Sequence, residues 1–463
     1  MKGIEDFIET RGTIVLCGII ALGAFLRLYH INYQSLWLDE LYSIVPTDPE
    51  NSLQSIIDYC KGDQPPFLFV YLHLVFKFFG YTELVGRVAC AFIGILGIPI
   101  VYFLAKECSN KTTGIVATLF VAINYFHIQY SQDIRFYGMT FLLSSLSYLF
   151  FIRAFKTNRP TDFVVYSIFT ICLLYTHYYG MIIFGTQAVT FLILLFYKSD
   201  LKFILNSIAS ATAVILAFLP WVPIVMNDLP VNVGWIKDPS PLFFAEYFYY
   251  YTGKDALTAS VFCVFIFLFF KKIFTGKDSN LGAKSISLII ILWILLSYLI
   301  PYIRSIMAAP MLADRYTIIT LPAWIVLFAL GWNTIQRLDM KYLILPLLIL
   351  SAIINLIFFR QYYTRIRNDQ WREASDLVLS RNHSHYPIYS TLAWHFNYYF
   401  RDNPERVSDL NSSDLGKVNN FWFLIAHASD EEVESQILKL QEMHVVVERH
   451  VFFGANAVLL EKK

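Results

Sequence analysis

Long apolar segments are the feature that most limits what this chain can fold into. A helix needs about 20 mostly apolar residues to cross the hydrocarbon core of a bilayer. The sequence holds about eleven stretches of roughly this length, at 13–30, 86–106, 112–129, 136–154, 162–178, 180–198, 203–225, 256–271, 285–304, 315–333 and 342–359. We therefore predict a polytopic α-helical membrane protein.

The overall composition supports this class and excludes others. Of the 463 residues, 57% are hydrophobic and 15% are charged, whereas soluble domains carry about 25% charged residues. The formal net charge of +1 leaves no field that would attract nucleic acid. The 6 cysteines form no CxxC pair, so we expect neither a disulfide framework nor a zinc site.

The basic residues indicate which ends of the spans face the cytoplasm, because cytoplasmic loops carry an excess of Lys and Arg. They collect in alternate connections: Lys106 and Lys111; Arg153, Lys156 and Arg159; Lys198 and Lys202; Lys271, Lys272, Lys277 and Lys284; Arg337 and Lys341. The N-terminus is then inside, with the first span retained as a signal anchor. The C-terminal end lies outside the inner (plasma) membrane.

Polar clusters that could carry chemistry fall on the opposite, outer side. Asp39 and Glu40 open the longest early loop, and ionisable residues at the edge of lipid are costly unless they have a function. The other clusters are Gln64-Pro65-Pro66, 131–137, 176–180 and 314–316. The topology comes from basic residues elsewhere, so this shared side independently favours one outer active site.

Two further regions differ from the spans. Within 31–85, residues 53–60 and 67–80 are expected to be helices along the outer interface, since about 14 apolar residues are few for a span. The alternative, that 67–80 crosses, would invert every later span.

From about 360, patterns predict helices near 369–381 and 430–443, the latter capped by Ser429, and strands near 387–391, 421–425, 445–447 and 457–460. We assign 1–360 to a transmembrane domain and 361–463 to a small extracytoplasmic α/β domain.

Four motifs together resemble GT-C glycosyltransferases of the protein-O-mannosyltransferase and aminoarabinose-transferase-like (PMT-like) group. Arg27-Leu28 with 35–40 is similar to the first-loop motif of that group, and Gln64-Pro65-Pro66-Phe67 with Glu83 and Arg87 to its next stretch. Residues 132–137 resemble its acidic-Arg-aromatic element, and 314–316 its late Arg-Tyr element. The resemblance covers roughly the first 330 residues in the expected order, and it implies a GT-C-like fold.

The resemblance implies sugar transfer from a polyprenyl-phosphate-linked donor to a protein, lipid or glycan, at the outer face of the bilayer and with inversion. A lipid phosphate is a good leaving group and needs no strong general acid. The acceptor hydroxyl is a poor nucleophile, for which a carboxylate base is worth about 10²–10⁴-fold in rate. The chemistry thus needs one base and cations for the departing phosphate.

The resemblance assigns the base to Asp39, the first acid of its pair. Glu40 points about 100° away on a helix, so we expect it to support rather than share that role. Asp133 is implied near the reaction centre. Arg315 is expected at the phosphate, because a guanidinium offers two parallel donors and keeps its charge. The other candidate substrate contacts are Arg135, Tyr137, Gln64, His177 and Tyr316.

Simpler roles exist for several of these side chains. Arg315 could reach lipid headgroups, Arg135 could pair with Asp133, and His177 could be an interfacial hydrogen-bonding residue. Gln64 stands where the group often has an acidic residue or His, which weakens a metal proposal. No metal site is assigned, and a divalent cation stays an open alternative.

Three alternative functions remain. A transporter or lipid flippase would place ionisable residues near the bilayer midplane, whereas these lie at helix ends. A GT-C enzyme using a lipid-diphosphate oligosaccharide would need a larger outer domain. An anchored interaction protein would leave Asp39 and Arg315 unexplained.

Overall fold

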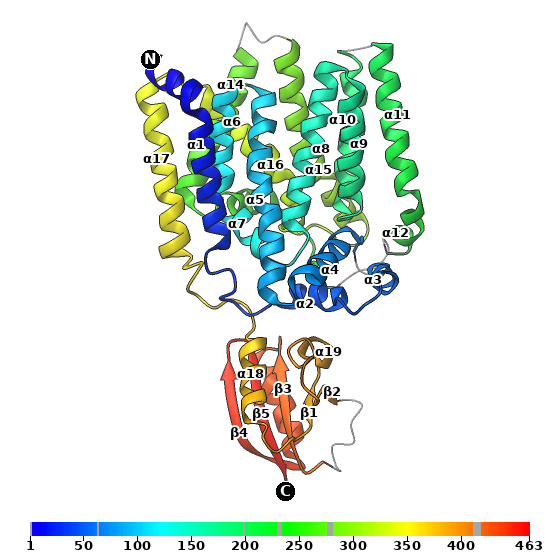
Figure 1. Ribbon diagram of the computed structural model, residues 1–463. Helices are drawn as coiled ribbons and strands as arrows, with labels where there is room; N and C mark the ends of the chain where they lie inside the picture. Colours follow the sequence, from blue (N-terminus) through cyan, green and yellow to red (C-terminus); the bar gives the residue numbers. More distant parts are fainter. Residues whose placement is uncertain (1, 63, 198–199, 229–233, 276–280, 411–417) are drawn as a thin grey trace. The chain divides into compact units, whose positions relative to one another are not determined.

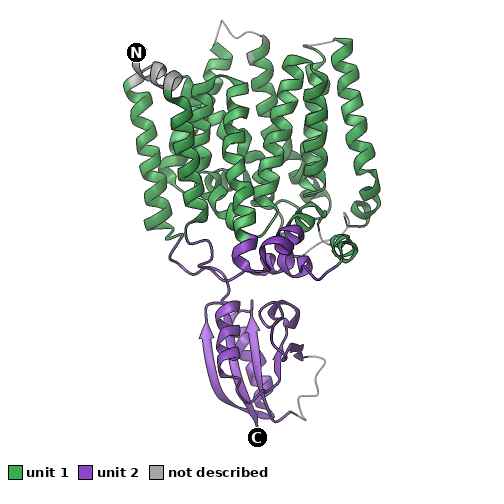
Figure 2. Ribbon diagram, viewed as in Figure 1, with its two compact units in different colours: residues 1–29, 52–71, 87–362 green, residues 30–51, 72–86, 363–463 purple. Residues whose placement is uncertain are grey.

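The computed structural model describes residues 2–62, 64–197, 200–228, 234–275, 281–410 and 418–463 (Figure 1). The chain divides into two compact units (Figure 2). The first, which we call the helical unit, comprises 1–29, 52–71 and 87–362. The second, the sheet unit, comprises 30–51, 72–86 and 363–463. Two early segments of the chain therefore belong with the C-terminal segment.

Among the described residues, 8 helices are long and apolar enough to cross a membrane. They are α1 (Lys2–Leu28), α5 (Glu83–Cys108), α8 (Tyr137–Thr157), α11 (Leu201–Phe218) continued by α12 (Val222–Asp228), α14 (Ala256–Thr275), α15 (Leu281–Met307), α16 (Leu321–Asn333) with the 3-10 turn η3 (Tyr316–Thr320) before it, and α17 (Leu338–Ile354). They run side by side in the bundle of Figure 1. The predicted multi-pass helical class is confirmed.

Three of the about eleven predicted spans form helices that are shorter than these candidates. They are α6 (Lys111–Ile123), α9 (Pro160–Leu174) and α10 (Tyr179–Leu194), of 13, 15 and 16 residues. At about 1.5 Å per residue they fall short of the roughly 30 Å hydrocarbon core. The apolar sequence continues past the points where these helices end, so composition alone overestimated their length.

The end of α6 shows how a helix can stop among apolar residues. Asn124 begins α7 (Tyr125–Gln132), and its Oδ1 accepts the amide of His127 at 2.9 Å. Arg27, fully buried in the last turn of α1, donates to the carbonyl oxygens of Val121 and Ala122 at 2.9 and 3.0 Å. A cation at a helix C-terminus is favourable, and backbone groups away from water need such partners.

The basic connections meet at one end of the helical unit. Lys156, after α8, forms a 3.1 Å ion pair with Glu107 at the end of α5. Asn158 donates to Asp200, just before α11, at 2.6 Å. The connections that alternate with these in the chain therefore lie at the other helix ends. Two basic residues counted in the sequence, Lys198 and Lys277, lie outside the described residues.

The connection between α1 and α5 contains the short helices α2 (Leu38–Ile44), α3 (Leu53–Cys60) and α4 (Phe67–Phe79). Ile56 and Phe69 pack with Leu174 at the end of α9 and with Trp221 beyond α11. The amide of Phe67 donates to the carbonyl of Tyr175 at 2.9 Å. With 13 residues, α4 is not among the candidate spans.

The C-terminal segment folds into a mixed sheet with the strand order β2-β1-β3-β5-β4. Its strands are β1 (Ile388–Ser390), β2 (Val407–Asp409), β3 (Asn420–Ala426), β4 (His444–Phe452) and β5 (Ala455–Lys462), and its helices are α18 (Trp371–Arg381), α19 (Ala393–Phe396) and α20 (Asp430–Gln441). Strands β2, β1 and β3 are parallel, and β5 and β4 add antiparallel pairs. Ser429 caps α20 as expected.

Replacing Arg27 by Leu should lower the melting temperature of the purified protein in detergent. The change leaves the buried carbonyls of Val121 and Ala122 without this donor, and each unsatisfied group costs about 1–3 kcal/mol. Arg337 is the control, because its ion pair with Asp339 is exposed and Arg337→Leu should change little. Equal melting temperatures for the two variants would contradict the role given to Arg27.

Candidate active site

Three of the polar motifs meet within the helical unit around the ring of Tyr316, the first residue of η3. The ring centroid of His177, in the turn between α9 and α10, lies 4.7 Å away. Phe136, just before α8, lies at 6.2 Å, and Trp235 at 5.9 Å. Four connections far apart in the sequence thus form one aromatic cluster, which we call the Tyr316 cluster.

Two guanidinium groups border the Tyr316 cluster. The Cζ atom of Arg315 lies 4.3 Å from the ring centroid of Trp235, and that of Arg135 lies 4.6 Å from the ring of Phe136. Arg135 is also close enough to His177 for its charge to act on the imidazole. Stacking on a ring occupies the face of a guanidinium and directs hydrogen bonding to its edges, the geometry that suits a planar or phosphate anion.

Two carboxylates belong to the same region. The Oδ1 atom of Asp314 accepts the amide of Arg315 at 2.8 Å. The amide of Arg135 donates to the carbonyl oxygen of Asp133 at 2.7 Å. Tyr130 of α7 lies near enough to Asp133, Asp314 and Arg315 for all three charges to act on its hydroxyl. The acidic and basic members of both motifs therefore converge.

His177 offers a hydrogen-bond donor inside the cluster. Its side chain is only 3% exposed, and Nδ1 accepts the amide of Tyr179 at 3.1 Å. That bond assigns the proton of the neutral ring to Nε2. Nε2 has no hydrogen-bond partner among the residues that the structure describes. Because buried N–H groups nearly always have partners, this one is suited to a ligand.

The remaining candidates of the helical unit take different positions. Tyr137 is fully buried at the start of α8, with its ring 6.5 Å from Tyr316 and 4.8 Å from Tyr130. Gln64 precedes α4, and its Oε1 is buried without a hydrogen-bond partner in the described part of the chain. Tyr137 thus joins the Tyr316 cluster, and Gln64 lies in the segment that leads into α4.

Asp39 and Glu40 lie in α2 (Leu38–Ile44), which belongs to the sheet unit, whereas the Tyr316 cluster belongs to the helical unit. Glu40 is fully buried, and its Oε2 accepts the amide of Trp37 at 3.1 Å. Asp39 is half-buried in the first turn of the helix. The two adjacent acids therefore differ in environment, and Glu40 stabilises the start of the helix that carries Asp39.

The described His, Cys, Asp and Glu side chains form no group of three or more that could hold a metal ion.

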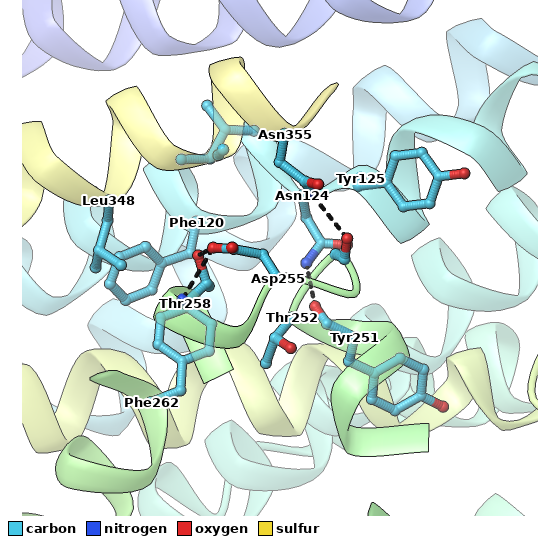
Figure 3. A pocket seen from close by; sticks show the side chains of 13 residues that line it. Phe120, Asn124, Tyr125, Tyr251, Thr252, Asp255, Thr258, Phe262, Leu348 and Asn355 are labelled. Carbon is cyan, nitrogen blue, oxygen red and sulfur yellow. Dashed lines mark hydrogen bonds between the residues drawn. The ribbon is translucent and has the colours of Figure 1, made fainter. Parts of the chain in front are cut away.

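A separate cavity of about 30 Å³, room for about one water, lies between α6, α14 and α17 (Figure 3). The Oδ2 atom of Asp255 accepts the amide of Thr258 at 2.9 Å and the hydroxyl of Ser351 at 2.8 Å. Asn355 donates to the carbonyl of Gly253 at 2.7 Å, in a turn that needs a φ of +78°. These bonds cap the start of α14, so we assign Asp255 a structural role.

Sequence reasoning missed Trp235 and Asp255. No motif marks Trp235, which reaches the Tyr316 cluster only through the fold. Asp255 carried a usable signal, since an acid directly before an apolar helical run is a common N-cap.

Comparisons with known proteins agree with this architecture. Residues 63–226 match the family model described as dolichyl-phosphate-mannose-protein mannosyltransferase. The crystal structure of ArnT from Cupriavidus metallidurans in the apo state superposes with a TM-score of 0.68 at 11% identity, covering 97% of this chain and 98% of that one. The structure of that ArnT bound to undecaprenyl phosphate gives 0.64 at 11% identity, with coverage of 97% and 98%.

A more distant fold match is the archaeal oligosaccharyltransferase AglB from Archaeoglobus fulgidus, in complex with an inhibitory peptide and a dolichol-phosphate. Its TM-score is 0.58 at 11% identity, covering 98% of this chain and 74% of that one. A search of curated protein sequences found no significant match.

The chain therefore shares its fold with this ArnT and with AglB. The resemblance seen in the sequence is thereby confirmed: residues 63–226 match a protein mannosyltransferase family model, and the fold of the chain is similar to that of ArnT.

Replacing Asp255 by Ala should destabilise the protein by about 0.5–2 kcal/mol, the usual cost of losing an N-cap. It should leave the affinity for a polyprenyl phosphate unchanged, because the Tyr316 cluster is not altered. Thermal unfolding and a lipid-binding titration would measure the two effects. Asp339→Ala, at an exposed position, is the control for stability. Loss of lipid binding in folded Asp255→Ala would show that this cavity is functional.

Proposed function

We propose that the protein is an integral-membrane glycosyltransferase that moves a sugar from a polyprenyl-phosphate-linked donor to an acceptor hydroxyl outside the cytoplasm. One observation carries this proposal: Arg135, Arg315 and the donor Nε2 of His177 gather at one aromatic cluster. The cluster lies in a fold shared with an ArnT that was solved bound to undecaprenyl phosphate.

The departing phosphate is the part of the reaction that cations assist. As the bond between the anomeric carbon and the phosphate oxygen breaks, its electron pair leaves with the phosphate. Preorganised donors stabilise that growing charge without reorganising during the reaction. We assign Arg315 to the phosphate, with Arg135 and His177 as further donors. Tyr137 and Tyr316 form the adjacent wall.

The acceptor is activated by a carboxylate. Asp39 removes the proton of the acceptor hydroxyl while its oxygen attacks the anomeric carbon from the face opposite the phosphate, so the configuration inverts. Glu40 supports Asp39 by capping α2 at the Trp37 amide. Asp133 and Asp314 balance the charge of the two arginines next to the reaction centre. Gln64 is a candidate contact in the first outer loop.

The proposed orientation places the reaction outside the cytoplasm. The connections rich in Lys and Arg meet at one end of the helical unit, through Lys156, Glu107, Asn158 and Asp200, and such loops are typically cytoplasmic. We propose that residues 1–360 form the catalytic membrane domain of an inner-membrane enzyme. Residues 361–463 then form an extracytoplasmic domain.

The extent of the fold favours a phosphate-linked donor over a lipid-diphosphate oligosaccharide. The chain covers 98% of ArnT but only 74% of AglB. A transporter or flippase is less consistent with the structure, because the charged groups gather at helix ends instead of near the middle of the spans.

Asp39→Asn should lower the rate of sugar transfer by at least about 10²-fold, because it removes the proton acceptor. Binding of the lipid donor should persist, since the phosphate contacts remain. Transfer by purified protein in detergent, measured with a radiolabelled lipid-linked sugar, is the test. Glu50→Gln, an exposed acid in the same loop, is the matched control. Near-normal turnover of Asp39→Asn would exclude it as the base.

Arg315→Lys should raise the donor KM about tenfold or more, although the charge is kept. A Lys cannot make two parallel bonds or stack on Trp235 in the same way, and one bond to a charged group contributes about 1.5–3 kcal/mol. Arg337→Lys, at the far end of the bundle, should behave as wild type. An unchanged KM for Arg315→Lys would remove Arg315 from the phosphate site.

A further inference from the structure

The loop that precedes α2 is bound to the start of α18 by a continuous set of hydrogen bonds within the sheet unit. Arg372 donates from its guanidinium to the carbonyl oxygens of Asn32 at 3.3 Å and Tyr33 at 3.1 Å. The amide of Arg372 donates to the hydroxyl of Ser35 at 3.1 Å. One residue of the C-terminal domain thus contacts three positions of this loop.

Residues next to Arg372 in the sequence form further hydrogen bonds with the same loop. Asn368 donates to the carbonyl of Ser35 at 2.9 Å, and Gln34 donates to the carbonyl of Arg365 at 2.7 Å. The amide of Arg367 returns a bond to Oε1 of Gln34 at 3.0 Å. Backbone and side-chain groups of the loop are therefore paired with the C-terminal domain only a few residues before Asp39.

An ion pair completes this contact. A guanidinium nitrogen of Arg372 lies 2.8 Å from Oε2 of Glu83, the first residue of α5. The Glu83 side chain is buried, with 7% of its surface exposed. Burial opposes the charged form of Arg372, but Glu83 and Glu373 outweigh it and raise its pKa. A carboxylate as buried as that of Glu83 is costly unless it is paired. Glu83 therefore fixes the guanidinium in the position from which it reaches Asn32 and Tyr33.

The helix α2 itself also contacts the C-terminal domain. Tyr42 packs edge-on against His395 of α19, with ring centroids 5.0 Å apart. Tyr81 donates to the carbonyl of Ile44, the last residue of α2, at 2.9 Å, and packs against Tyr398 at 5.5 Å. Contacts with the C-terminal domain thus exist before, along and after the segment that carries Asp39.

We infer that the C-terminal domain serves to position the base of the reaction, and that Arg372 is the positioning residue through which it does so. The inference rests on the proposed function, because it concerns the loop of Asp39. Arg372 touches neither donor nor acceptor in this account. It acts by holding the 32–35 backbone, and a displacement of about 1 Å at a reacting group can cost about 10²-fold in rate.

The test compares Arg372→Lys and Arg372→Gln with Arg381→Gln in the purified full-length protein. Arg381 lies on the same helix and forms an exposed 2.8 Å ion pair with Glu448, so it is the matched control. Transfer kinetics give kcat and the donor KM, and hydrogen–deuterium exchange reports on the amides of residues 32–44. Asn368→Ala, which removes only the bond to the Ser35 carbonyl, is a milder second variant in case the others fold poorly.

Both Arg372 variants should lower kcat by about 10–10²-fold with an unchanged donor KM, and should accelerate exchange across 32–44. Lys should not rescue, because its donors all radiate from one nitrogen, whereas the guanidinium reaches Asn32 and Glu83 from one nitrogen and Tyr33 from another. Asn368→Ala should shift both readouts in the same direction to a smaller extent, and Arg381→Gln should match wild type.

A wild-type kcat despite accelerated exchange would overturn the inference, since the contact would then be structural only. A lowered kcat without accelerated exchange would also overturn it, because Arg372 would then act by another route. If the wild-type protein transfers no sugar, the proposed function fails on its own, and the exchange data still decide whether Arg372 holds this loop.

Discussion

The rest of the helical unit depends on one constraint: helices that end inside the bundle need hydrogen-bond partners from within the protein. Within an apolar bundle, the carbonyl and amide groups at a helix end cannot turn to water. Arg27 meets this need at the end of α6, and Asn355 meets it beside Gly253. Tyr251 connects this region to η3, since Asn124 binds its carbonyl and its hydroxyl contacts Thr317. The polar groups that stabilise helix ends are thus hydrogen-bonded to η3, the turn that carries Tyr316.

The proposed chemistry divides between the two units. The helical unit gathers the cations for the leaving group, with the guanidinium groups of Arg315 and Arg135 lying over the rings of Trp235 and Phe136. The sheet unit carries the base, on a short helix whose own caps involve Glu40 and whose flanking loop is held by Arg372. Seven residues cannot form a stable helix alone, so the accuracy of Asp39 must come from such tertiary contacts. This gives the C-terminal domain a role in the reaction without a contact to substrate.

The sequence predicted the features that depend on local residue patterns. It did not predict the features that depend on contacts between residues far apart in the chain. Apolar length predicted the multi-pass class, and the cap at Ser429 predicted the start of α20. The motifs at 131–137, 176–180 and 314–316 suggested the residues that meet around Tyr316. The lengths of three helices were overestimated, because apolar side chains continue past helix ends such as Asn124. Trp235 and the Arg372–Glu83 pair carry no local pattern, since only the fold brings their partners together.

The most direct test of the central claim is a structure of the full-length protein with a polyprenyl phosphate bound, determined by electron cryo-microscopy in a lipid nanodisc. The account predicts that the phosphate lies within hydrogen-bond distance of the Arg315 guanidinium and the Nε2 atom of His177, with the Asp39 carboxylate facing the same lipid headgroup. A phosphate bound elsewhere in the bundle, or an Asp39 side chain that faces another compartment, would contradict it.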